Sequence, residues 1–307
     1  MNGLLMKKEN RWLSALMHPG RSWQRIVLRF YRLLPEKKYL EKVLDYFYEQ
    51  KSDLDNPQTF NEKMNWLKLY DHNPLYHTLV DKYEVKAHVA EIVGDKYVVP
   101  CYGVWDIFDD IDFGRLPNSF VLKPTNWGCP MVVKDKTQLD IAKAKKYFDD
   151  CKKFDIYKAT HEWGYKDVKP RILADMFLDD HSVNNQLQDY KWWCFNGVPK
   201  IMYFTIKSDK AYENFYDMDF KPLAIDHGFP RFKPEFEKPE AFEEMKQLAA
   251  KLSQGIPFVR MDFFYVNGQI YFGEYTMYDW GGVRPFATYE QDLEIGNFLN
   301  LPFEKEA

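Results

Sequence analysis

The chain has 307 residues, 46% of them hydrophobic and 29% charged, with a formal net charge of -4. This charge argues against a general nucleic-acid partner, because binding a phosphate backbone needs a basic face. No uninterrupted apolar run is long enough to cross a bilayer, and residues 1–20 lack the apolar segment and cleavage site of a signal peptide, so we expect a cytoplasmic protein. The four cysteines are widely spaced, which favours reduced thiols over a zinc site or a disulfide framework.

The first 78 residues are predicted to be mostly helical. Residues 21–34 place apolar side chains on one helical face and four arginines on another. This basic amphipathic helix either contacts the inner face of the cell membrane peripherally or packs on the protein with its arginines in solvent. Further helices are predicted over residues 38–49 and, after the cap-like Thr59, over residues 61–69.

From residue 81 onward the pattern changes to interleaved helices and strands. Predicted helices cover residues 81–94, 136–152 and 239–254. Predicted strands cover residues 97–105, 120–124, 130–136 and 171–178, together with hairpins about Asn196-Gly197 and Asn267-Gly268. Residues 207–237 are predicted to be rich in loops. The bias towards hairpins predicts an α+β class and not a doubly wound sheet.

Side chains along the strand over residues 190–197 alternate between the two faces of a sheet. Trp192 and Trp193 therefore point in opposite directions, and one of them is a candidate to line a site while the other is buried. Asp189 and Lys191 share one face and are candidates for a cleft.

The last hairpin carries two acids whose geometry depends on its turn. With a two-residue turn at Asn267-Gly268, Asp262 faces Gly273 and Glu274 points to the other side of the sheet. With a three-residue loop that starts at Val266, Gly268 forms a bulge at the turn and the register changes.

In that second register Arg260 pairs with Glu274 and Asp262 with Phe272, so Arg260, Asp262, Glu274 and Thr276 share one face. Adjacent carboxylates are what Mg²⁺ bound to a triphosphate needs. The alternative is a surface ion pair between Arg260 and Glu274. A second feature, Lys123 at the end of an apolar strand before a turn, is a candidate phosphate contact, although that turn contains one glycine.

The order of these segments resembles the ATP-grasp superfamily, and closely its TupA-like branch, which is linked to cell-surface polysaccharide synthesis. The segments that carry the resemblance are NPQTFNEKMNWLKLYD, DKYEVK, VVPCYGVWD, LPNSFVLKP, RILADMFL, DYKWWCFNGVPK, NFYDMDF and IPFVRMDFFYVNGQIYFGEYT, from about residue 56 to 302. The resemblance implies two α+β subdomains that clasp ATP. We expect an N-terminal helical region (1–78), a subdomain with the phosphate lysines and lid loop (79–175) and one with the metal-binding hairpin (176–303).

The resemblance also assigns roles to individual residues. Lys82 and Lys123 would hold the phosphates, and Asn126 and Gly128 belong to the lid loop beside them. The nucleotide hinge would comprise Asp175, Met176, Phe177 and Leu178, with Asp179 or Asp180 at the ribose. The Mg²⁺ ligands would be Asp262 and Glu274, with Thr276 beside them, and Arg260 would steady the transferred phosphate. Arg284 is a candidate for binding a substrate carboxylate, because a fork-shaped donor suits that group.

Three departures from the family pattern are visible. Asp175 stands where many relatives have glutamate, residues 126–130 replace a His-Gly-Ser-Gly type of lid, and residues 278–282 replace a Pro-Gly-Ser-Gly stretch. Either the lid is adapted to its substrate, with Trp127 stacked on a sugar, or catalysis is weakened. Cys129 lies beside the phosphates, but a ligase of this kind needs no thiol nucleophile.

The function implied by the resemblance is an ATP- and Mg²⁺-dependent amide ligase. Its acceptor would be a glycan carboxylate, such as that of a uronic acid, which is joined through an acyl-phosphate to a small amine such as an amino acid or amino alcohol. Two alternatives stay open. One is a glycan kinase, and the other is a non-catalytic glycan-binding protein that keeps the fold.

Overall fold

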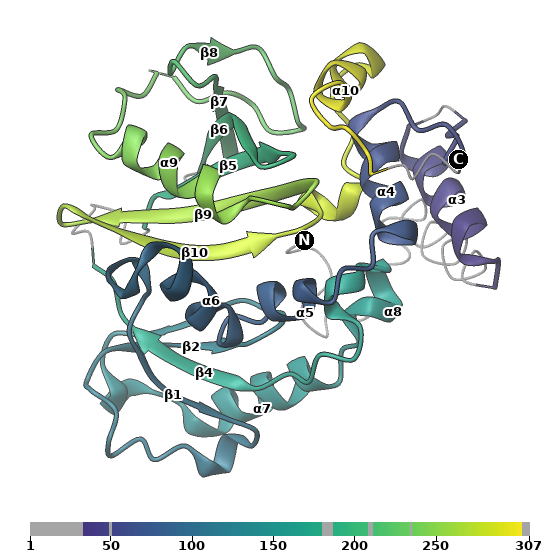
Figure 1. Cartoon of the computed structure of the whole chain (residues 1–307). Helices are drawn as coiled ribbons and strands as arrows, with labels where there is room; N and C mark the ends of the chain where they lie inside the picture. Colours follow the sequence, from purple (N-terminus) through teal and green to yellow (C-terminus); the bar gives the residue numbers. More distant parts are fainter. Residues whose placement is uncertain (1–32, 49–50, 180–186, 208–210, 234, 303–307) are drawn as a thin grey trace.

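The computed structural model describes residues 33–48, 51–179, 187–207, 211–233 and 235–302 (Figure 1). Helices in these residues are α3 (Glu36–Tyr48), α4 (Phe60–Tyr70), α5 (Leu75–Val80), α6 (Glu84–Val93), α7 (Ile141–Lys152), α8 (Ile156–Thr160), α9 (Phe242–Leu252) and α10 (Tyr289–Gly296). Strands are β1 (Cys101–Trp105), β2 (Phe120–Pro124), β3 (Met131–Val133), β4 (Ile172–Met176), β5 (Asp189–Phe195), β6 (Val198–Lys207), β7 (Ala211–Tyr216), β8 (Pro222–Leu223), β9 (Phe258–Val266) and β10 (Gln269–Thr276). Antiparallel sheets with surrounding helices confirm the α+β class.

The smaller sheet has the strand order β1-β4-β2-β3. Its core brings Phe148 of α7 against Phe120, Leu122 and Ile172. Helix α7 begins at Ile141, later than predicted, because the Asp140 side chain caps it by accepting a hydrogen bond from the Lys143 N–H.

The larger sheet has the order β10-β9-β5-β6-β7-β8 and is covered on both faces. Trp192 packs on Phe242 of α9, with ring centroids 5.0 Å apart, and Trp193 stacks on Phe60 of α4 at 5.4 Å. Both tryptophans are fully buried, so the expectation that one of them lines the site is wrong. Helix α4 covers the part of the sheet face on which Trp193 lies, so no ligand can reach that indole.

Residues 207–237, predicted to be loop-rich, contain the strands β7 and β8, and that prediction is wrong in this respect. Strand β7 buries Glu213 and Asn214, two polar residues at interior positions. Polar side chains at these places hide the alternation on which a strand prediction depends.

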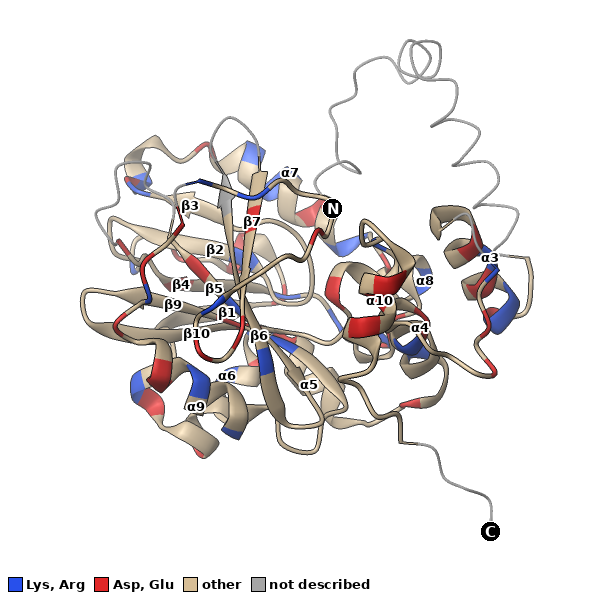
Figure 2. Ribbon diagram, turned by 90° about the horizontal axis from the view of Figure 1, so that it is seen from above, with Lys and Arg blue, Asp and Glu red and all other residues tan. Residues whose placement is uncertain are grey.

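Helix α4 joins the N-terminal region to the C-terminal end of the chain. It begins with a capping box, in which Thr59 accepts from the N–H of Glu62 and the Glu62 side chain accepts from the N–H of Thr59. Asp292 of α10 accepts from the Asn61 N–H at 3.1 Å, which places an acid at the positive end of α4. Figure 2 shows acidic residues gathered on α10, which carries Glu290, Asp292 and Glu294.

The other side of α4 holds the turn that follows β10. Asn65 Nδ2 donates to Gly282 O and Lys68 Nζ donates to Gly281 O, both at 2.6 Å. The predicted basic helix over residues 21–34 lies almost wholly outside the described residues. The division into 1–78, 79–175 and 176–303 stays a prediction. Its second boundary falls one residue before the end of β4.

Helices α5 and α6 lie between the two sheets (Figure 1). Helix α6 ends at Val93, and the predicted end residue Gly94 caps it with φ at +103°. On one side Lys86 of α6 reaches Asp175 of β4, and close by Val98 bridges to Phe272 of β10. Residues from both sheets therefore meet around α6.

Candidate functional site

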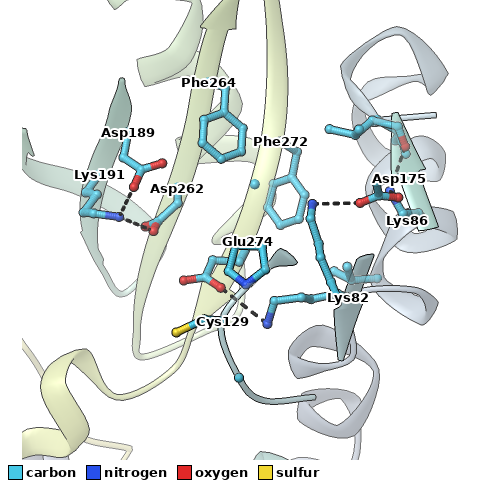
Figure 3. Close-up of a pocket in the computed structure, with 17 residues that line it drawn as sticks. Lys82, Lys86, Cys129, Asp175, Asp189, Lys191, Asp262, Phe264, Phe272 and Glu274 are labelled. Carbon is cyan, nitrogen blue, oxygen red and sulfur yellow. Dashed lines mark hydrogen bonds and ion pairs between the residues drawn. The ribbon is translucent and has the colours of Figure 1, made fainter. Parts of the chain in front are cut away.

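A pocket of about 290 Å³ lies where α6 and the two sheets meet (Figure 3). Its charged walls are Lys82, Lys86, Lys123, Asp175, Asp189, Lys191, Asp262 and Glu274. Its apolar walls are Val85, Val98, Val99, Phe264 and Phe272, and residues 128–130 and Gly273 complete it. One cavity thus offers an apolar surface suited to a flat ring and a concentration of ammonium and carboxylate groups.

The β9–β10 hairpin has a different turn from the one predicted. Gln269 pairs directly with Val266, so Asn267-Gly268 is a two-residue turn, with both residues at positive φ (51° and 81°). The three-residue loop and the pairs that it implied, Arg260 with Glu274 and Asp262 with Phe272, are therefore wrong.

A bulge further along the hairpin restores the predicted common face. The register shifts between Phe272 and Glu274, so that Asp262 pairs with Glu274 and Arg260 with Thr276. Gly273 forms the bulge, where a Cβ would lie 3.0 Å from the Asp262 carbonyl oxygen. The side chains of Arg260, Asp262, Glu274 and Thr276 contact one another on one face of the hairpin.

Arg260 and Lys191 neutralise Asp262 in this structure. Arg260 Nε donates to Asp262 Oδ1 at 2.6 Å and Nη2 donates to Oδ2 at 2.8 Å, while Lys191 Nζ donates to Oδ2 at 2.5 Å. Lys191 also contacts Asp189 at 3.3 Å. Burial is the largest influence and lowers the pKa of Lys191, but the charges of Asp262, Asp189 and Glu274 together raise the pKa above its ordinary value. Lys191 and Asp189 line the pocket, as predicted for that face of β5.

Glu274 of β10 lies on the same sheet as Lys191 of β5, with Asp262 of β9 between them. Its Oε1 accepts from Arg260 Nη2 at 3.0 Å, and its Oε2 lies 3.6 Å from Lys82 Nζ. Burial alone would raise the pKa of Glu274, but Lys82, Arg260 and Lys191 lower it to about 2. The carboxylate is therefore ionised throughout the physiological range, as a metal ligand must be.

The two predicted phosphate lysines are both in the pocket. Lys82 precedes α6, and its backbone N–H is fixed by Thr125 O at 2.7 Å. Lys123 of β2 donates to Asp175 Oδ2 at 2.8 Å. Lys86, which we did not single out although it lies in the DKYEVK segment, reaches the other oxygen of Asp175 at 3.0 Å. Asp175 therefore orients two ammonium groups towards the same cavity.

Of the predicted hinge, Asp175 lines the pocket, whereas Met176, Phe177 and Leu178 do not. Leu178 is buried with Val99 and Val266 beneath the pocket wall, and Met176 packs against them. Phe177 lies under the ammonium of Lys134, 5.8 Å from its ring centroid. Asp180 lies outside the described residues.

The lid loop follows β2 directly. Gly128 lines the pocket at φ +112°, and a Cβ there would lie 2.9 Å from the Pro124 ring. Asn126 is buried and does not line the pocket. Trp127 stacks on Phe154, with centroids 4.3 Å apart, so its indole packs on the protein's own α7–α8 segment.

Arg284 lies outside the pocket. Its guanidinium lies between the rings of Phe229 and Trp280, at 3.8 and 4.1 Å from their centroids, and Glu213 Oε1 is 3.5 Å from its Nη1. The role of Arg284 in binding a substrate carboxylate stays a prediction.

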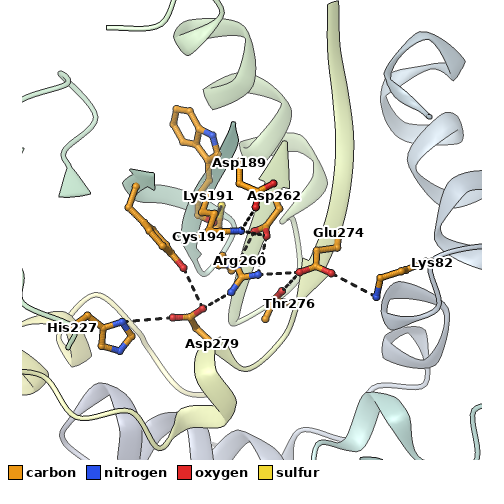
Figure 4. Close-up of polar contacts among 12 residues, drawn as sticks. Lys82, Asp189, Lys191, Cys194, His227, Arg260, Asp262, Glu274, Thr276 and Asp279 are labelled. Carbon is orange, nitrogen blue, oxygen red and sulfur yellow. Dashed lines mark hydrogen bonds and ion pairs between the residues drawn. The ribbon is translucent and has the colours of Figure 1, made fainter. Parts of the chain in front are cut away.

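Asp279 is a further charged residue that the sequence did not reveal. Its side chain is fully buried, its Oδ1 accepts from Arg260 Nη1 at 2.7 Å, and its Oδ2 lies 4.0 Å from His227 Nδ1. Figure 4 shows the resulting path of polar contacts from Lys82 through Glu274 and Arg260 to Asp279. The only feature of the sequence that pointed to Asp279 was its position in the 278–282 segment, which departs from the family pattern.

The donor set fits a triphosphate with Mg²⁺. Four ammonium groups, those of Lys82, Lys86, Lys123 and Lys191, line one cavity and suit phosphate oxygens. Asp262 and Glu274 are directly paired on adjacent strands and supply the hard oxygen ligands that Mg²⁺ takes from a protein.

Comparison with known proteins gives a family match. The model described as TupA-like ATPgrasp matches residues 62–300. No curated protein matches the sequence.

Three solved structures are similar at low identity. D-alanine–D-alanine ligase from Bacillus anthracis is 13% identical, with a TM-score of 0.41, over 72% of this chain and 60% of its own. D-alanyl-alanine synthetase A from Vibrio cholerae is 15% identical, with a TM-score of 0.44, over 72% and 63%. ATP-grasp ligase PsnB complexed with minimal precursor is 11% identical, with a TM-score of 0.38, over 75% and 60%. The chain spans less than two thirds of each, and at these TM-scores the likeness carries no functional argument.

Proposed function

Because the chain belongs to the TupA-like ATP-grasp family, we propose that it is an ATP- and Mg²⁺-dependent ligase that joins a glycan carboxylate to a small amine. The observation that carries this proposal is the pairing of Asp262 with Glu274 inside a pocket that also contains Lys82, Lys123 and Lys191. Two acids alone would suit many cations, but this directly paired couple lies among four ammonium groups, which suits a metal that arrives with phosphates.

The metal ligands would be Asp262 and Glu274, and the Thr276 hydroxyl, 3.4 Å from Glu274 Oε1, would orient the second. When bound, Mg²⁺ would supply positive charge that offsets the charge of the triphosphate in the transition state. Lys191 and Arg260, which contact Asp262 here, would turn to the reacting phosphate.

The rest of the pocket would hold the nucleotide. Lys82 and Lys123 would contact its phosphates, with Asn126 and Gly128 in the loop over them. Asp175 would orient Lys123, and the adenine would lie in the apolar part of the cavity. Met176, Phe177 and Leu178 would form the hinge behind the cavity wall, with Asp180 at the ribose. Phe264 and Phe272 offer the flat surfaces that a purine needs.

The proposed reaction has two steps. A carboxylate oxygen of the glycan, such as that of a uronic acid, attacks the γ-phosphorus, the bond to ADP breaks, and an acyl-phosphate forms. The amine nitrogen, of an amino acid or amino alcohol, then attacks the acyl carbon, and inorganic phosphate leaves. Arg260 would stabilise the charge that develops on the transferred group, and Arg284 would bind a substrate carboxylate.

The decisive experiment supplies ATP, Mg²⁺, uronic-acid glycans and amino compounds in combination and measures phosphate release and product mass. A ligase releases inorganic phosphate and gives a condensed product only when glycan and amine are both present. A kinase would leave the phosphate on the sugar with no amine required. A non-catalytic binder would show no Mg²⁺-dependent affinity for ATP.

The same proposal places the protein in cell-surface polysaccharide synthesis, in the cytoplasm next to the membrane. Among the described residues no helix has the length and apolar character to cross a bilayer. Peripheral contact through the basic segment at residues 21–34 would bring the pocket near a lipid-linked glycan. A flotation assay with anionic vesicles tests this membrane contact. Wild-type protein should float with the vesicles, and an Arg25→Glu/Arg29→Glu variant should not.

A further inference from the structure

Arg260 is bonded to three carboxylates at once (Figure 4). Its Nε and Nη2 donate to the two oxygens of Asp262, and Nη2 also donates to Glu274 at 3.0 Å. Its Nη1 donates to Asp279 at 2.7 Å. Each of the three nitrogens of the guanidinium is therefore committed to an acid, and two of those acids are the proposed metal ligands.

A metal ion and this guanidinium compete for the same oxygens. Hard cations bind carboxylates through the lone pairs that Arg260 and Lys191 use here on Asp262. The ion pairs also oppose a metal, because Arg260, Lys191 and Lys82 already contact Asp262 and Glu274, while Asp279 and Asp189 help to hold Arg260 and Lys191 in place. A divalent cation alone would have to displace these side chains from the carboxylate oxygens that it needs.

Asp279 is placed to stay hydrogen-bonded to Arg260 when Asp262 and Glu274 no longer contact it. Its side chain is fully buried, and its remaining contacts are with Tyr203 at 3.4 Å and His227 at 4.0 Å. Burial keeps His227 neutral, with a pKa of about 3, so the charge that Asp279 balances by direct hydrogen bonding is that of Arg260. The turn that carries Asp279 is itself held by Asn65 and Lys68 of α4.

We propose that Asp279 is a positioning residue that holds Arg260 clear of Asp262 and Glu274 when nucleotide phosphates enter, so that the metal binds only together with the nucleotide. This inference rests on the proposed function. Phosphates draw Lys191 and the Nε and Nη2 groups of Arg260 towards themselves, and Asp279 retains the guanidinium by Nη1. The two carboxylates then become available, and metal and nucleotide each strengthen binding of the other.

Manganese is the probe for the test. Its dissociation constant is measured by electron paramagnetic resonance on the whole chain, with and without the non-hydrolysable analogue in which nitrogen bridges the β- and γ-phosphates. We expect Mn²⁺ to bind the complex of wild-type protein and analogue at least about tenfold more tightly than it binds the protein alone or the analogue alone. This factor is what one displaced charged hydrogen bond is worth.

Two variants separate the roles of the residues. Arg260→Gln removes the competing cation, so Mn²⁺ should bind without nucleotide at least about tenfold more tightly than it binds wild type. Asp279→Asn leaves Arg260 on the metal ligands, so Mn²⁺ binding with the analogue should weaken about tenfold while metal-free analogue binding stays within about twofold. In the Arg260→Gln background, Asp279→Asn should have no further effect, because Asp279 acts through Arg260.

Glu213→Gln is the control, because it replaces another buried acid side chain that contacts Arg284 and not Arg260, and it should leave Mn²⁺ affinity unchanged. If Asp279→Asn does not fold, nucleotide-free Mn²⁺ binding by Arg260→Gln and by wild type still tests whether Arg260 competes with the metal. Unchanged nucleotide-free binding in Arg260→Gln, or equal effects of Asp279→Asn in both backgrounds, would overturn the inference while leaving the proposed function standing. A wild type that binds no Mn²⁺ with the analogue would overturn the proposed function itself.

Discussion

Asp262 is the residue on which the charges of the pocket converge. It is buried, it is shared by Arg260 and Lys191, and it pairs across the hairpin with Glu274. Its role can be separated from that of Asp189, which contacts the same lysine at 3.3 Å but is not paired with Glu274. These two acids give a matched pair of substitutions.

Asp262→Asn should abolish ATP turnover, with a fall of roughly a hundredfold or more in Mg²⁺-dependent phosphate release, because one of two metal carboxylates is lost. The fold should survive, because asparagine keeps the shape and Arg260 retains Glu274 and Asp279 as partners. Phosphate release and circular dichroism melting check this. Asp189→Asn should lose far less activity, and wild-type activity in Asp262→Asn would remove the metal assignment.

Glu213 is a buried acid whose ionisation couples to stability. Burial raises its pKa from 4.5 to about 8, although Arg284 opposes the shift. Between pH 4.5 and about pH 8, Glu213 is therefore protonated in the folded state and ionised in the unfolded state. The stability that this proton contributes is present below pH 4.5 and is lost as pH rises towards 8.

We expect Glu213→Gln to remove that part of the pH dependence. Between about pH 5 and 8, wild-type Tm should fall relative to the variant, and the two curves should run parallel above the folded pKa. Thermal melts in a series of buffers measure it. A constant Tm difference across the whole range would show that Glu213 is ionised in the folded protein.

At the scale of elements, the β9–β10 hairpin shows what sequence can and cannot give. The reversal of the chain at Asn267-Gly268, both strands and the shared face of Asp262 and Glu274 were predicted, and the structure has them, although the predicted three-residue loop is wrong. The register was wrong because a bulge was placed at the turn and not at Gly273. A glycine inside a strand is the signal for a bulge, but its position is decided by contact with Asp262 O and Phe264 across the hairpin.

Helix α4 shows an element whose role in the site comes entirely from tertiary contact. The helix and its capping residue Thr59 were predicted from the sequence. Its hydrogen bonds to the turn after β10 were not, because they join residues more than two hundred positions apart. That turn has three successive residues at positive φ, Trp280, Gly281 and Gly282. A non-glycine residue in this conformation is strained, so the turn depends on its partners.

Lys68→Met should loosen this turn. The buried Lys68 ammonium donates to Gly281 O, and its loss leaves a carbonyl unsatisfied at a cost of about 1–3 kcal/mol. We expect faster hydrogen exchange in residues 278–284 and a lower Tm. Lys63→Met is the matched control, because Lys63 lies on the same helix but donates to Gly296 and Leu299. It should affect residues 296–300 instead, and equal exchange at 278–284 in both variants would contradict the specific role of Lys68.

For the whole molecule, the order of the segments was enough to predict the family. The predicted residues Lys82, Lys123, Asp262 and Glu274 do line one pocket. Lys86 and Asp279 were missed for a common reason. Each is defined by a partner from a distant segment, Asp175 for Lys86 and Arg260 for Asp279. Neither carries a local spacing that distinguishes it from an ordinary surface charge.

The pocket is built from both sheets, and this makes ligand binding a test of the whole arrangement. Lys123 and Asp175 come from the smaller sheet, while Asp262 and Glu274 come from the larger one. A nucleotide with Mg²⁺ that contacts both walls binds only the folded form. At a hundred times its dissociation constant, such a ligand stabilises the fold by about 2.7 kcal/mol.

We therefore expect ATP with Mg²⁺ to raise Tm by roughly 3–8 °C, and ATP without Mg²⁺ to raise it much less. Lys123→Met removes a contact on one wall and Glu274→Gln removes one on the other, so each should lose most of the shift although they lie on different sheets. Lys145→Met, on the exposed face of α7, is the control and should keep it. If one wall variant kept the full shift, the nucleotide would be held by the other sheet alone, and the two sheets would not form one site.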